Sequence, residues 1–551
     1  MAQGATLKFS SAVRGGPSCE VRSPLGYRLT VSGSTNDIQP KVVDGDSSMT
    51  GNLALVENAW AFTLHKEFGR LAPTPEEQKS HRKQAEVHKE VVENIAPLLD
   101  SLGDEVLSDW CSGCFTYSDH VKVEQEGLKL PTYICETCGT PTIPCVAPGC
   151  AYMAVRGSGS IRLPSYCAEH SHKIPSFERA ADKVARLEDY ATLYEYDERN
   201  LARATRVVAV AGIGAGVLAT AAVSAAPAIG GLISSGTATL TGGTTLYGAA
   251  AASHGLALLG GGAASGGALA FGVTGGTCVV TVVGAALGGA LGTSITNAYL
   301  SEDKSFSIEL FRDGPGIPVL VARGWLTENS NEWSEAMQAV ERRYPDSPVY
   351  RVHWGSKEQK ALAALALKGS GGGAAGAGAF AVGRKASKSA AKKVPFLGGA
   401  LAVAEVAKNP WHTAVVRADK TGVLLASILA RTEIDRCILV GHSLGGRVMI
   451  TAAETLGTDP DAPRIQTLHT LGAAEGKKGD WRPLNDAVED AVHNYYSAND
   501  KVLEIAYRTA QVGDKAIGRY GFGTAFPKIH DHEVTDRVGG HTEYFGSVTL
   551  R

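Results

Sequence analysis

The C-terminal part of the sequence predicts an α/β fold built on a mostly parallel sheet, and two features indicate it. From about residue 305 onward, short apolar runs typical of buried strands alternate with amphipathic helical stretches. One of these runs, RCILVG, leads through a glycine-flanked serine into the helical pattern LGGRVMITAAETL. Strands that alternate with helices usually pair in parallel, so residues 305–551 are expected to form one α/β domain.

The apolar runs are the predicted strands of this sheet, and helical patterns such as NEWSEAMQAVERRY and NDAVEDA lie between most of them. One connection is much longer than the others, and we interpret residues 356–433 as an insertion. It is a lid, a membrane-contacting cap or a plain linker, with a helix from about Trp411 to Ala430. The predicted strands are 317–324, 348–354, 436–441, 465–472, 491–497 and 529–535.

The sequence before this domain is expected to divide into four regions, of which the first three carry many charges. A helical region covers residues 1–107, with its clearest helix at 75–102. A cysteine-rich module follows at 108–175. Residues 176–206 read as a charged helix that begins with Ser as the N-cap.

The fourth region, residues 207–301, contains no Asp, Glu, Lys or Arg. Two stretches in it, 207–233 and 266–292, are long enough to cross a bilayer as helices. Their small residues recur at spacings that permit close helix packing in lipid. We expect a Gly/Ala-rich helical segment that inserts into a membrane, permanently or conditionally. The alternative is a buried helical layer in a soluble domain.

Charge and composition limit the cellular context. The formal net charge of −3 gives no broad attraction to nucleic acid. The N-terminal stretch MAQGATLKFSSAVRGG has no apolar core of the kind a secretory signal needs. We therefore expect a membrane-associated protein whose soluble domains lie in the cytoplasm. In that compartment its cysteines are reduced, which favours metal ligation over disulfides.

The cysteine-rich module at 108–175 has spacings typical of zinc sites. Eight ligands indicate two structural zinc ions, paired either sequentially or in an interleaved order. His172 competes with His170 for the eighth position, and the alternative interpretation is a set of buried free thiols. Closed four-ligand sites predict a stabilising or protein-docking role. The candidate ligands are Cys111, Cys114, Cys135, Cys138, Cys145, Cys150, Cys167 and His170.

The segment Gly441-His442-Ser443-Leu444-Gly445 is the candidate nucleophile motif. In a chain with 65 glycines the G-x-S-x-G pattern alone is weak. Its context is stronger, because a nucleophile elbow requires a buried strand, a sharp turn and a helix in this order. Glycines flank such a serine because a Cβ would clash in the crowded turn. Ser443 is therefore the predicted nucleophile.

The acid and the base of a triad are expected after later strands, in the chain order that α/β-hydrolases use. Asp500 lies just past an aromatic strand, and His541 follows two glycines near the C-terminus. The aspartate would hold the imidazole in the required tautomer, and the histidine would take the serine proton. Asp500 also reads as a helix cap. Weaker candidates are His530 and His532 for the base and Asp531 and Asp536 for the acid.

The oxyanion hole needs two backbone N–H groups. One is expected from Leu444, directly after the nucleophile. The other is expected from the turn after the first core strand, RGWLTE, where Trp325 or Leu326 would donate.

Five stretches in the same chain order also resemble a known family. They are RGWLTENSNEW, NPWHTAVVRADKTGVLLASIL, VGHSLGGRV, NYYSANDKVLEIAYR and VGGHTEYF. Together they resemble the transmembrane and coiled-coil domain protein four family of α/β-hydrolases, over roughly residues 200–551. The resemblance implies a membrane-spanning glycine-rich stretch before a hydrolase domain, with triad roles for Ser443, Asp500 and His541. The cysteine module is a departure from this pattern.

These observations predict a serine hydrolase that cleaves an ester at a membrane surface, as a lipase or phospholipase does. Two other hypotheses remain open. The first is a membrane-attached adaptor whose hydrolase fold is unused and whose zinc module binds a protein partner. The second is a toxin whose glycine-rich hairpin permeabilises membranes.

Overall fold

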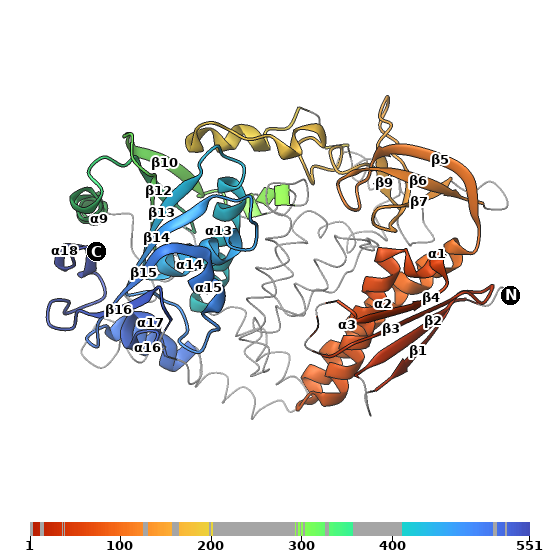
Figure 1. The fold of residues 1–551 in the computed structure, drawn as a ribbon, viewed down its shortest axis with the longest axis horizontal. Helices are drawn as coiled ribbons and strands as arrows, with labels where there is room; N and C mark the ends of the chain where they lie inside the picture. Colours follow the sequence, from red (N-terminus) through yellow and green to blue (C-terminus); the bar gives the residue numbers. More distant parts are fainter. Residues whose placement is uncertain are drawn as a thin grey trace, which may run out of the picture. The chain divides into compact units, whose positions relative to one another are not determined.

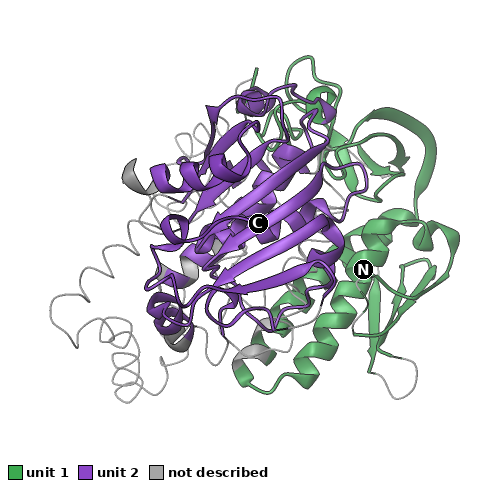
Figure 2. Cartoon of the chain, turned by 60° about the vertical axis from the view of Figure 1, so that its left-hand side comes forward, with its two compact units in different colours: residues 1–180, 195–229, 237–259 green, residues 181–194, 230–236, 260–551 purple. Residues whose placement is uncertain are grey.

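The computed structural model describes most of the chain in two compact units (Figures 1 and 2). The N-terminal unit comprises the described residues up to 180 and from 195 to 201, and the C-terminal unit comprises residues 181–194 and the described residues from 292 onward. The described residues are 4–11, 16–35, 37, 39–124, 131–156, 165–197, 200–201, 292–293, 296–297, 299–300, 303–324, 330–355, 410–510, 515–523 and 526–551.

The N-terminal unit begins with a four-stranded antiparallel sheet, which the predicted helical region 1–107 did not include. The order is β1-β2-β3-β4. One face of β2 and β3 is buried through Cys19, Val21, Leu29 and Val31, and α2 packs on it. These strands place only two buried residues each among polar ones, so their alternation is too short to stand out in the sequence. The strands are β1 (Thr6–Ser10), β2 (Ser18–Arg22), β3 (Arg28–Ser32) and β4 (Val42–Gly45).

Helices follow, and here the prediction is confirmed. After the short α1 (Ser47–Thr50), α2 (Leu53–Leu71) packs along α3 (Pro75–Leu99), the helix expected at 75–102. The side chain of Asn52 caps α2 by accepting from the Leu55 N–H at 2.9 Å.

The cysteine-rich region forms a second antiparallel sheet in the order β5-β6-β7-β8-β9. The charged helix expected at 176–206 is wrong over 178–194, where two 3₁₀ helices form, η1 (Glu178–Ala181) and η2 (Leu187–Tyr194). Leu187, Tyr190 and Leu193 are buried at a spacing of three, which matches the 3₁₀ period. The strands are β5 (Leu102–Trp110), β6 (Tyr117–Val123), β7 (Thr132–Cys135), β8 (Pro141–Pro144) and β9 (Met153–Val155).

The C-terminal unit is built on a seven-stranded sheet in the order β10-β12-β11-β13-β14-β15-β16. All six predicted strands are present and pair in parallel, and the edge strand β10, which was not predicted, runs antiparallel to β12. Exposed residues alternate with buried or half-buried ones along β10, so it lacks the continuous apolar run of its neighbour β12. The strands are β10 (Ser307–Arg312), β11 (Val319–Arg323), β12 (Val349–His353), β13 (Arg436–His442), β14 (Arg464–Leu471), β15 (Val488–Tyr496) and β16 (Ile529–Glu533).

Helices cover both faces of this sheet (Figure 1). Leu320 and Ala322 of β11 pack with α13 and α14, whereas Val319 and Val321 pack with α9 and α18 on the other face. Helix α13 confirms the helix expected at 411–430, and the helix expected at NDAVEDA ends at Ala487, where β15 begins. The helices are α9 (Ser330–Arg343), α13 (Pro410–Leu429), α14 (Leu444–Leu456), α15 (Arg482–Ala487), α16 (Lys501–Ala510), α17 (Ile517–Tyr520) and α18 (Tyr544–Ser547).

Residues 181–194 form a strap on the C-terminal unit. Arg431, one of the largest fully buried side chains, donates from Nε to the Asp182 carbonyl at 3.0 Å. Its guanidinium group lies 5.6 Å from the centre of the Tyr194 ring. Leu187 and Tyr190 belong to the same apolar cluster as the inner residues of the sheet. The strap is therefore part of the core of this unit.

Two predicted features lie outside the described residues. Apart from residues 292–293, 296–297 and 299–300, the charge-free segment 207–301 is not described, and neither is the insertion from 356 to 409. Within the part of the chain that is described, we find no helix with both the length and the apolar character that crossing a membrane requires. The predicted membrane segment stays a prediction.

Candidate active site and candidate metal centres

Ser443 stands at the sharp turn between β13 and α14. Its backbone has φ 59° and ψ −126°, which is rare for a residue with a side chain. The flanking glycines make the turn feasible: a Cβ on Gly441 would lie 2.5 Å from the Gly445 carbonyl oxygen, and one on Gly445 would lie 2.3 Å from that of Ala322. Strained residues of this kind cost about 1–3 kcal/mol and cluster at functional sites.

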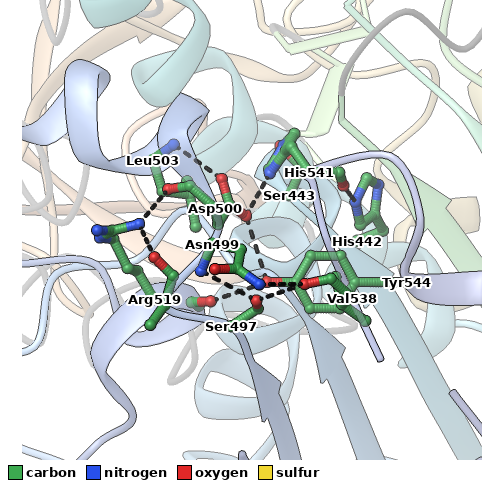
Figure 3. Close-up of polar contacts among 12 residues, drawn as sticks. His442, Ser443, Ser497, Asn499, Asp500, Leu503, Arg519, Val538, His541 and Tyr544 are labelled. Atoms are coloured by element: carbon green, nitrogen blue, oxygen red, sulfur yellow. Dashed lines mark hydrogen bonds and ion pairs between the residues drawn. The ribbon is translucent and has the colours of Figure 1, made fainter. Parts of the chain in front are cut away.

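The structure brings Ser443, His541 and Asp500 together in one hydrogen-bonded array (Figure 3). Nε2 of His541 lies 2.7 Å from the Ser443 hydroxyl oxygen, and its Nδ1 lies 2.6 Å from Oδ2 of Asp500. Ser443 and Asp500 are fully buried and His541 is 5% exposed. The three residues lie in the turns after β13, β15 and β16. Because these strands are parallel, their carboxyl ends lie on the same side of the sheet and bring the three side chains together.

The two oxygens of the Asp500 carboxylate make different contacts, one as a helix cap and one to the imidazole of His541. Its Oδ1 accepts from the Leu503 N–H at 3.0 Å and so caps α16, while Oδ2 faces His541. The Tyr544 hydroxyl lies 3.3 Å from the same Oδ2 and 3.1 Å from the Gly518 carbonyl. Burial and the nearby carboxylate raise the pKa of Tyr544, so its hydroxyl stays protonated and can donate.

A second group of residues, missed in the sequence, holds the loop that carries His541. The Ser497 hydroxyl donates to the Val538 carbonyl at 2.8 Å, and the Asn499 amide donates to the Thr535 carbonyl at 2.9 Å. Arg519 instead contacts the turn that carries the acid, since it donates to the Asp500 carbonyl at 3.0 Å (Figure 3). The only signal was the small polar stretch Ser-Ala-Asn before Asp500, which is typical of any turn.

The competing acid and base candidates lie elsewhere. His530 and His532 are on β16, and Nε2 of His532 contacts Nδ1 of His493 at 3.0 Å. The carboxylate of Asp531 accepts from the Phe522 and Gly523 N–H groups, and Asp536 is exposed. The structure therefore brings none of these four to Ser443.

The expected oxyanion donors are described only in part. Leu444 is the first residue of α14, and the first N–H groups of a helix lack an acceptor within it. Gly324, the residue directly after β11, approaches it so closely that a Cβ on Gly324 would lie 2.3 Å from the Leu444 nitrogen. Trp325 and Leu326 lie outside the described residues, so the second donor stays a prediction.

The cysteine-rich region forms two separate clusters with metal-binding geometry, paired sequentially along the chain. In each cluster the four ligand atoms lie within 4.8 Å of one another. The first cluster is Cys111, Cys114, Cys135 and Cys138, and the second is Cys145, Cys150, Cys167 and His170.

Distances within both clusters fit a tetrahedral ion. Sγ atoms are 3.9 Å apart for Cys111 and Cys138, and likewise for Cys114 and Cys135. Zn–S bonds of about 2.3 Å place two sulfurs of a tetrahedron about 3.8 Å apart. In the second cluster Nδ1 of His170 faces the sulfurs. His172 is instead stacked on Tyr196 at 4.1 Å, which decides between the two histidines.

Hydrogen-bond donors surround the sulfurs of these clusters. The Gly113 N–H donates to Cys111 at 3.2 Å, and the Cys167 N–H donates to Cys145 at the same distance. Hydroxyls of Thr116 and Thr140 lie near Cys114 and Cys138. Donors of this kind stabilise thiolates, the form in which cysteine binds a metal.

The fold and the site define a protein with a helix-covered, mostly parallel sheet that carries a buried Ser-His-Asp array. The chain belongs to the family described as "Protein of unknown function (DUF726)", whose match covers residues 199–550. The family match thus covers the whole seven-stranded sheet and the Ser443 array, whereas the two cysteine clusters precede it in the sequence.

Two curated relatives are similar over a shorter stretch. The "Transmembrane and coiled-coil domain-containing protein STS1" of Oryza sativa subsp. japonica is 28% identical over 27% of this chain and 22% of its own length. An uncharacterized membrane protein of Schizosaccharomyces pombe is 28% identical over 26% of this chain and 19% of its own length. The chain therefore spans about a fifth of these relatives. The resemblance drawn from the sequence motifs is confirmed at the level of this family, and its hydrolase activity stays a prediction.

Proposed function

We propose that the C-terminal unit is a serine hydrolase with an α/β-hydrolase fold and that it cleaves an ester. One observation carries the proposal: His541 contacts the Ser443 hydroxyl through one ring nitrogen and the Asp500 carboxylate through the other. The chain order Ser, Asp, His and the strained turn at Ser443 are those of a nucleophile elbow. A structural role alone does not require a buried serine in so strained a backbone.

The proposed reaction begins at the Ser443 hydroxyl. Nε2 of His541 takes the hydroxyl proton while the serine oxygen attacks the acyl carbonyl carbon. Asp500 accepts from Nδ1–H, fixes the tautomer and stabilises the imidazolium that forms. The tetrahedral intermediate then collapses: the bond to the alcohol breaks, and the alcohol leaves with the proton from His541. Water attacks the acyl-enzyme in the same way and releases the acid.

The oxyanion of the intermediate needs preorganised donors. Leu444 supplies one N–H from the start of α14, and we assign the second to the turn after β11, in Trp325 or Leu326. The tight approach of Gly324 to Leu444 supports this assignment, since Gly324 is the residue directly before Trp325. Loss of one such donor typically costs about 10²–10³-fold in rate.

We further propose a lipid ester as the substrate class and a membrane as the place of reaction. The charge-free stretch 207–301 supports this, because its apolar runs have the length of bilayer-spanning helices. The names of the two relatives point the same way. The substrate would then be a lipid, cleaved as by a lipase or phospholipase.

We assign the two cysteine clusters to structural zinc. Seven thiolates and one imidazole in closed sets of four are the donors that zinc prefers. When bound, zinc would crosslink β5–β9 and the loops around them. Each cluster is closed by four protein ligands, so we assign the zinc no part in the ester chemistry.

The test is covalent labelling of the purified full chain with a fluorophosphonate, with and without liposomes. We expect labelling of the wild type and none of Ser443→Ala or His541→Ala. His530→Ala is the matched control, because it removes a histidine of the same unit outside the array, and it should label normally.

Stronger labelling with liposomes would support an interfacial lipase. No labelling of the wild type under either condition would contradict the proposal. It would favour an adaptor that uses the cysteine clusters to bind a protein partner.

A further inference from the structure

The histidine directly before the nucleophile has no part in the proposed reaction, yet it lies against the base. His442 is 1% exposed, and its ring centre is 5.0 Å from that of His541. Its Nε2 lies 2.8 Å from the backbone carbonyl oxygen of His541 (Figure 3). This contact joins the strand that ends at Ser443 to the loop that carries the base.

The environment of His442 allows one protonation state. A carbonyl oxygen only accepts, so Nε2 must carry the proton. Among the described residues no partner faces Nδ1, and the rings of Tyr544 and Phe545 pack around the imidazole. Burial, the neighbouring His541 and the positive Arg323 lower the pKa of His442 well below its usual range. The ring is therefore a neutral Nε2–H donor.

We propose that His442 is a positioning residue that fixes the backbone of His541 through a neutral ring, so that the imidazole of His541 reaches Ser443 and Asp500 together. The inference rests on the proposed function. The two contacts of His541 are short, at 2.7 and 2.6 Å on opposite ring nitrogens, so a small shift of its backbone breaks one of them. Displacement of a catalytic group by about 1 Å can cost 10²-fold in rate.

The absence of charge on the His442 imidazole is the second part of its proposed role. His541 becomes an imidazolium when it takes the serine proton. A charged ring beside it would oppose this step, because two like charges repel strongly at such a distance in a buried site. A lysine or arginine could donate to the same carbonyl but would add that charge. A neutral imidazole supplies the donor without it.

A pair of variants separates the hydrogen bond from ring packing. His442→Phe keeps an aromatic ring and removes the donor, while His442→Gln places an amide N–H near the position of Nε2. We expect the Phe variant to lose about tenfold to 10²-fold in labelling rate and in kcat, with KM nearly unchanged. The Gln variant should recover most of this loss.

Labelling of the Phe variant within twofold of the wild type would overturn the inference. So would equal losses in both variants with matching drops in Tm, since packing would then explain them. A wild type that never labels removes the proposed function as well, whereas a labelled wild type with an insensitive Phe variant removes the inference alone.

Nitrogen-15 NMR of the wild-type histidines tests the ring directly and does not depend on activity. We expect one histidine, identified by its loss in His442→Gln, to stay in the neutral Nε2–H tautomer from pH 5 to pH 8. A His442 ring that titrates in this range, or that carries its proton on Nδ1, would contradict the inference. This measurement decides the question if His442→Phe does not fold.

Discussion

The Ser443 array and the two cysteine clusters both bring distant side chains to one point, but the two sites are assembled in opposite ways. Ser443 and His541 are 98 positions apart, and Asp500 and His541 are 41 apart, so only the intact seven-stranded sheet brings them together. The ligands of each cluster lie within one short stretch, 111–138 or 145–170. The array depends on the fold, whereas under the zinc assignment the local fold around the clusters would depend on the bound metal.

This difference predicts that each site can be removed without the other. A change in the array should abolish chemistry and leave the fold, because the sheet and its core remain. A change in a cluster should unfold a local region and leave the chemistry.

The largest expected effect is on chemistry. Ser443→Ala should abolish fluorophosphonate labelling and lower ester hydrolysis by about 10⁴-fold or more, as loss of a triad nucleophile does. Its Tm should equal or exceed that of the wild type, because the variant keeps the core and removes a hydroxyl. A large fall in Tm would mean that the serine serves structure.

Metal removal should give the largest effect on stability. Structural zinc contributes about 10–16 kcal/mol in small zinc modules, so chelation should unfold residues 102–175. Circular dichroism and limited proteolysis would detect this, and labelling of Ser443 should persist. Cys135→Ser should lower the zinc content by one ion per chain. Cys19→Ala, which removes a thiol outside both clusters, should leave it unchanged. A purified wild-type chain that contains no zinc would contradict the assignment of the clusters to structural zinc, and with it the contrast between the two sites.

The turn after β11 offers a sharper test of the array. A Cβ on Gly324 would stand 2.3 Å from the Leu444 nitrogen, so Gly324→Ala must displace either the turn or the elbow. We expect about a 10²-fold slower labelling, as for loss of an oxyanion donor. Gly546→Ala is the control, because its new Cβ meets only ordinary contacts from 3.5 Å. Equal rates for the two variants would place the oxyanion hole elsewhere.

Asn499→Ala should have a smaller effect. It removes two hydrogen bonds to the loop that carries His541, to the carbonyls of Thr535 and Val538. Each is worth about 1 kcal/mol, so we expect roughly tenfold lower kcat and a modest fall in Tm. A steady-state comparison of kcat and KM would show this. An unchanged kcat would mean that the loop keeps its position without the hydrogen bonds from Asn499.

The smallest effect is a pH dependence of stability. Burial and the neighbouring His532 and His530 lower the pKa of His493 to about 4, while the unfolded chain has a value of about 6.5. The unfolded state binds more protons between these values, so the free energy of unfolding should fall as the pH drops from about 6.5 to 4.

Urea unfolding at several pH values would measure this slope. His493→Gln should reduce it without changing stability at pH 8. An identical slope in the variant would assign the pH dependence to other groups. The first of these other groups to test is the buried His469, because burial lowers the pKa of its side chain as well.

The sequence predicted the central strands β11 and β13 of the C-terminal sheet well because they are buried on both faces. β13 reads as a continuous apolar run, and such runs are visible without any knowledge of the partner strand. β10 was missed because its exposed residues alternate with buried or half-buried ones and it has no continuous apolar run. The N-terminal sheet was missed for the same reason.

Within the site, residues with distinctive chemistry were predicted and supporting residues were not. Ser443, Asp500 and His541 could be named from motif order, and the structure brings them together. Ser497 and Asn499 could not, because their partners are backbone carbonyls around forty positions away that no local pattern marks. The choice between His170 and His172 also needed the fold, since the two positions are equivalent by spacing.

The strap at 181–194 has a practical consequence for dissecting the protein. The family match begins at residue 199, after the strap, so a fragment cut at that boundary would omit it. Such a fragment would lack the Asp182 carbonyl that accepts from the buried Arg431, together with Leu187 and Tyr190 of the core. An independently expressed C-terminal unit should therefore start before residue 181, and domain limits drawn from family matches alone would yield an unstable product.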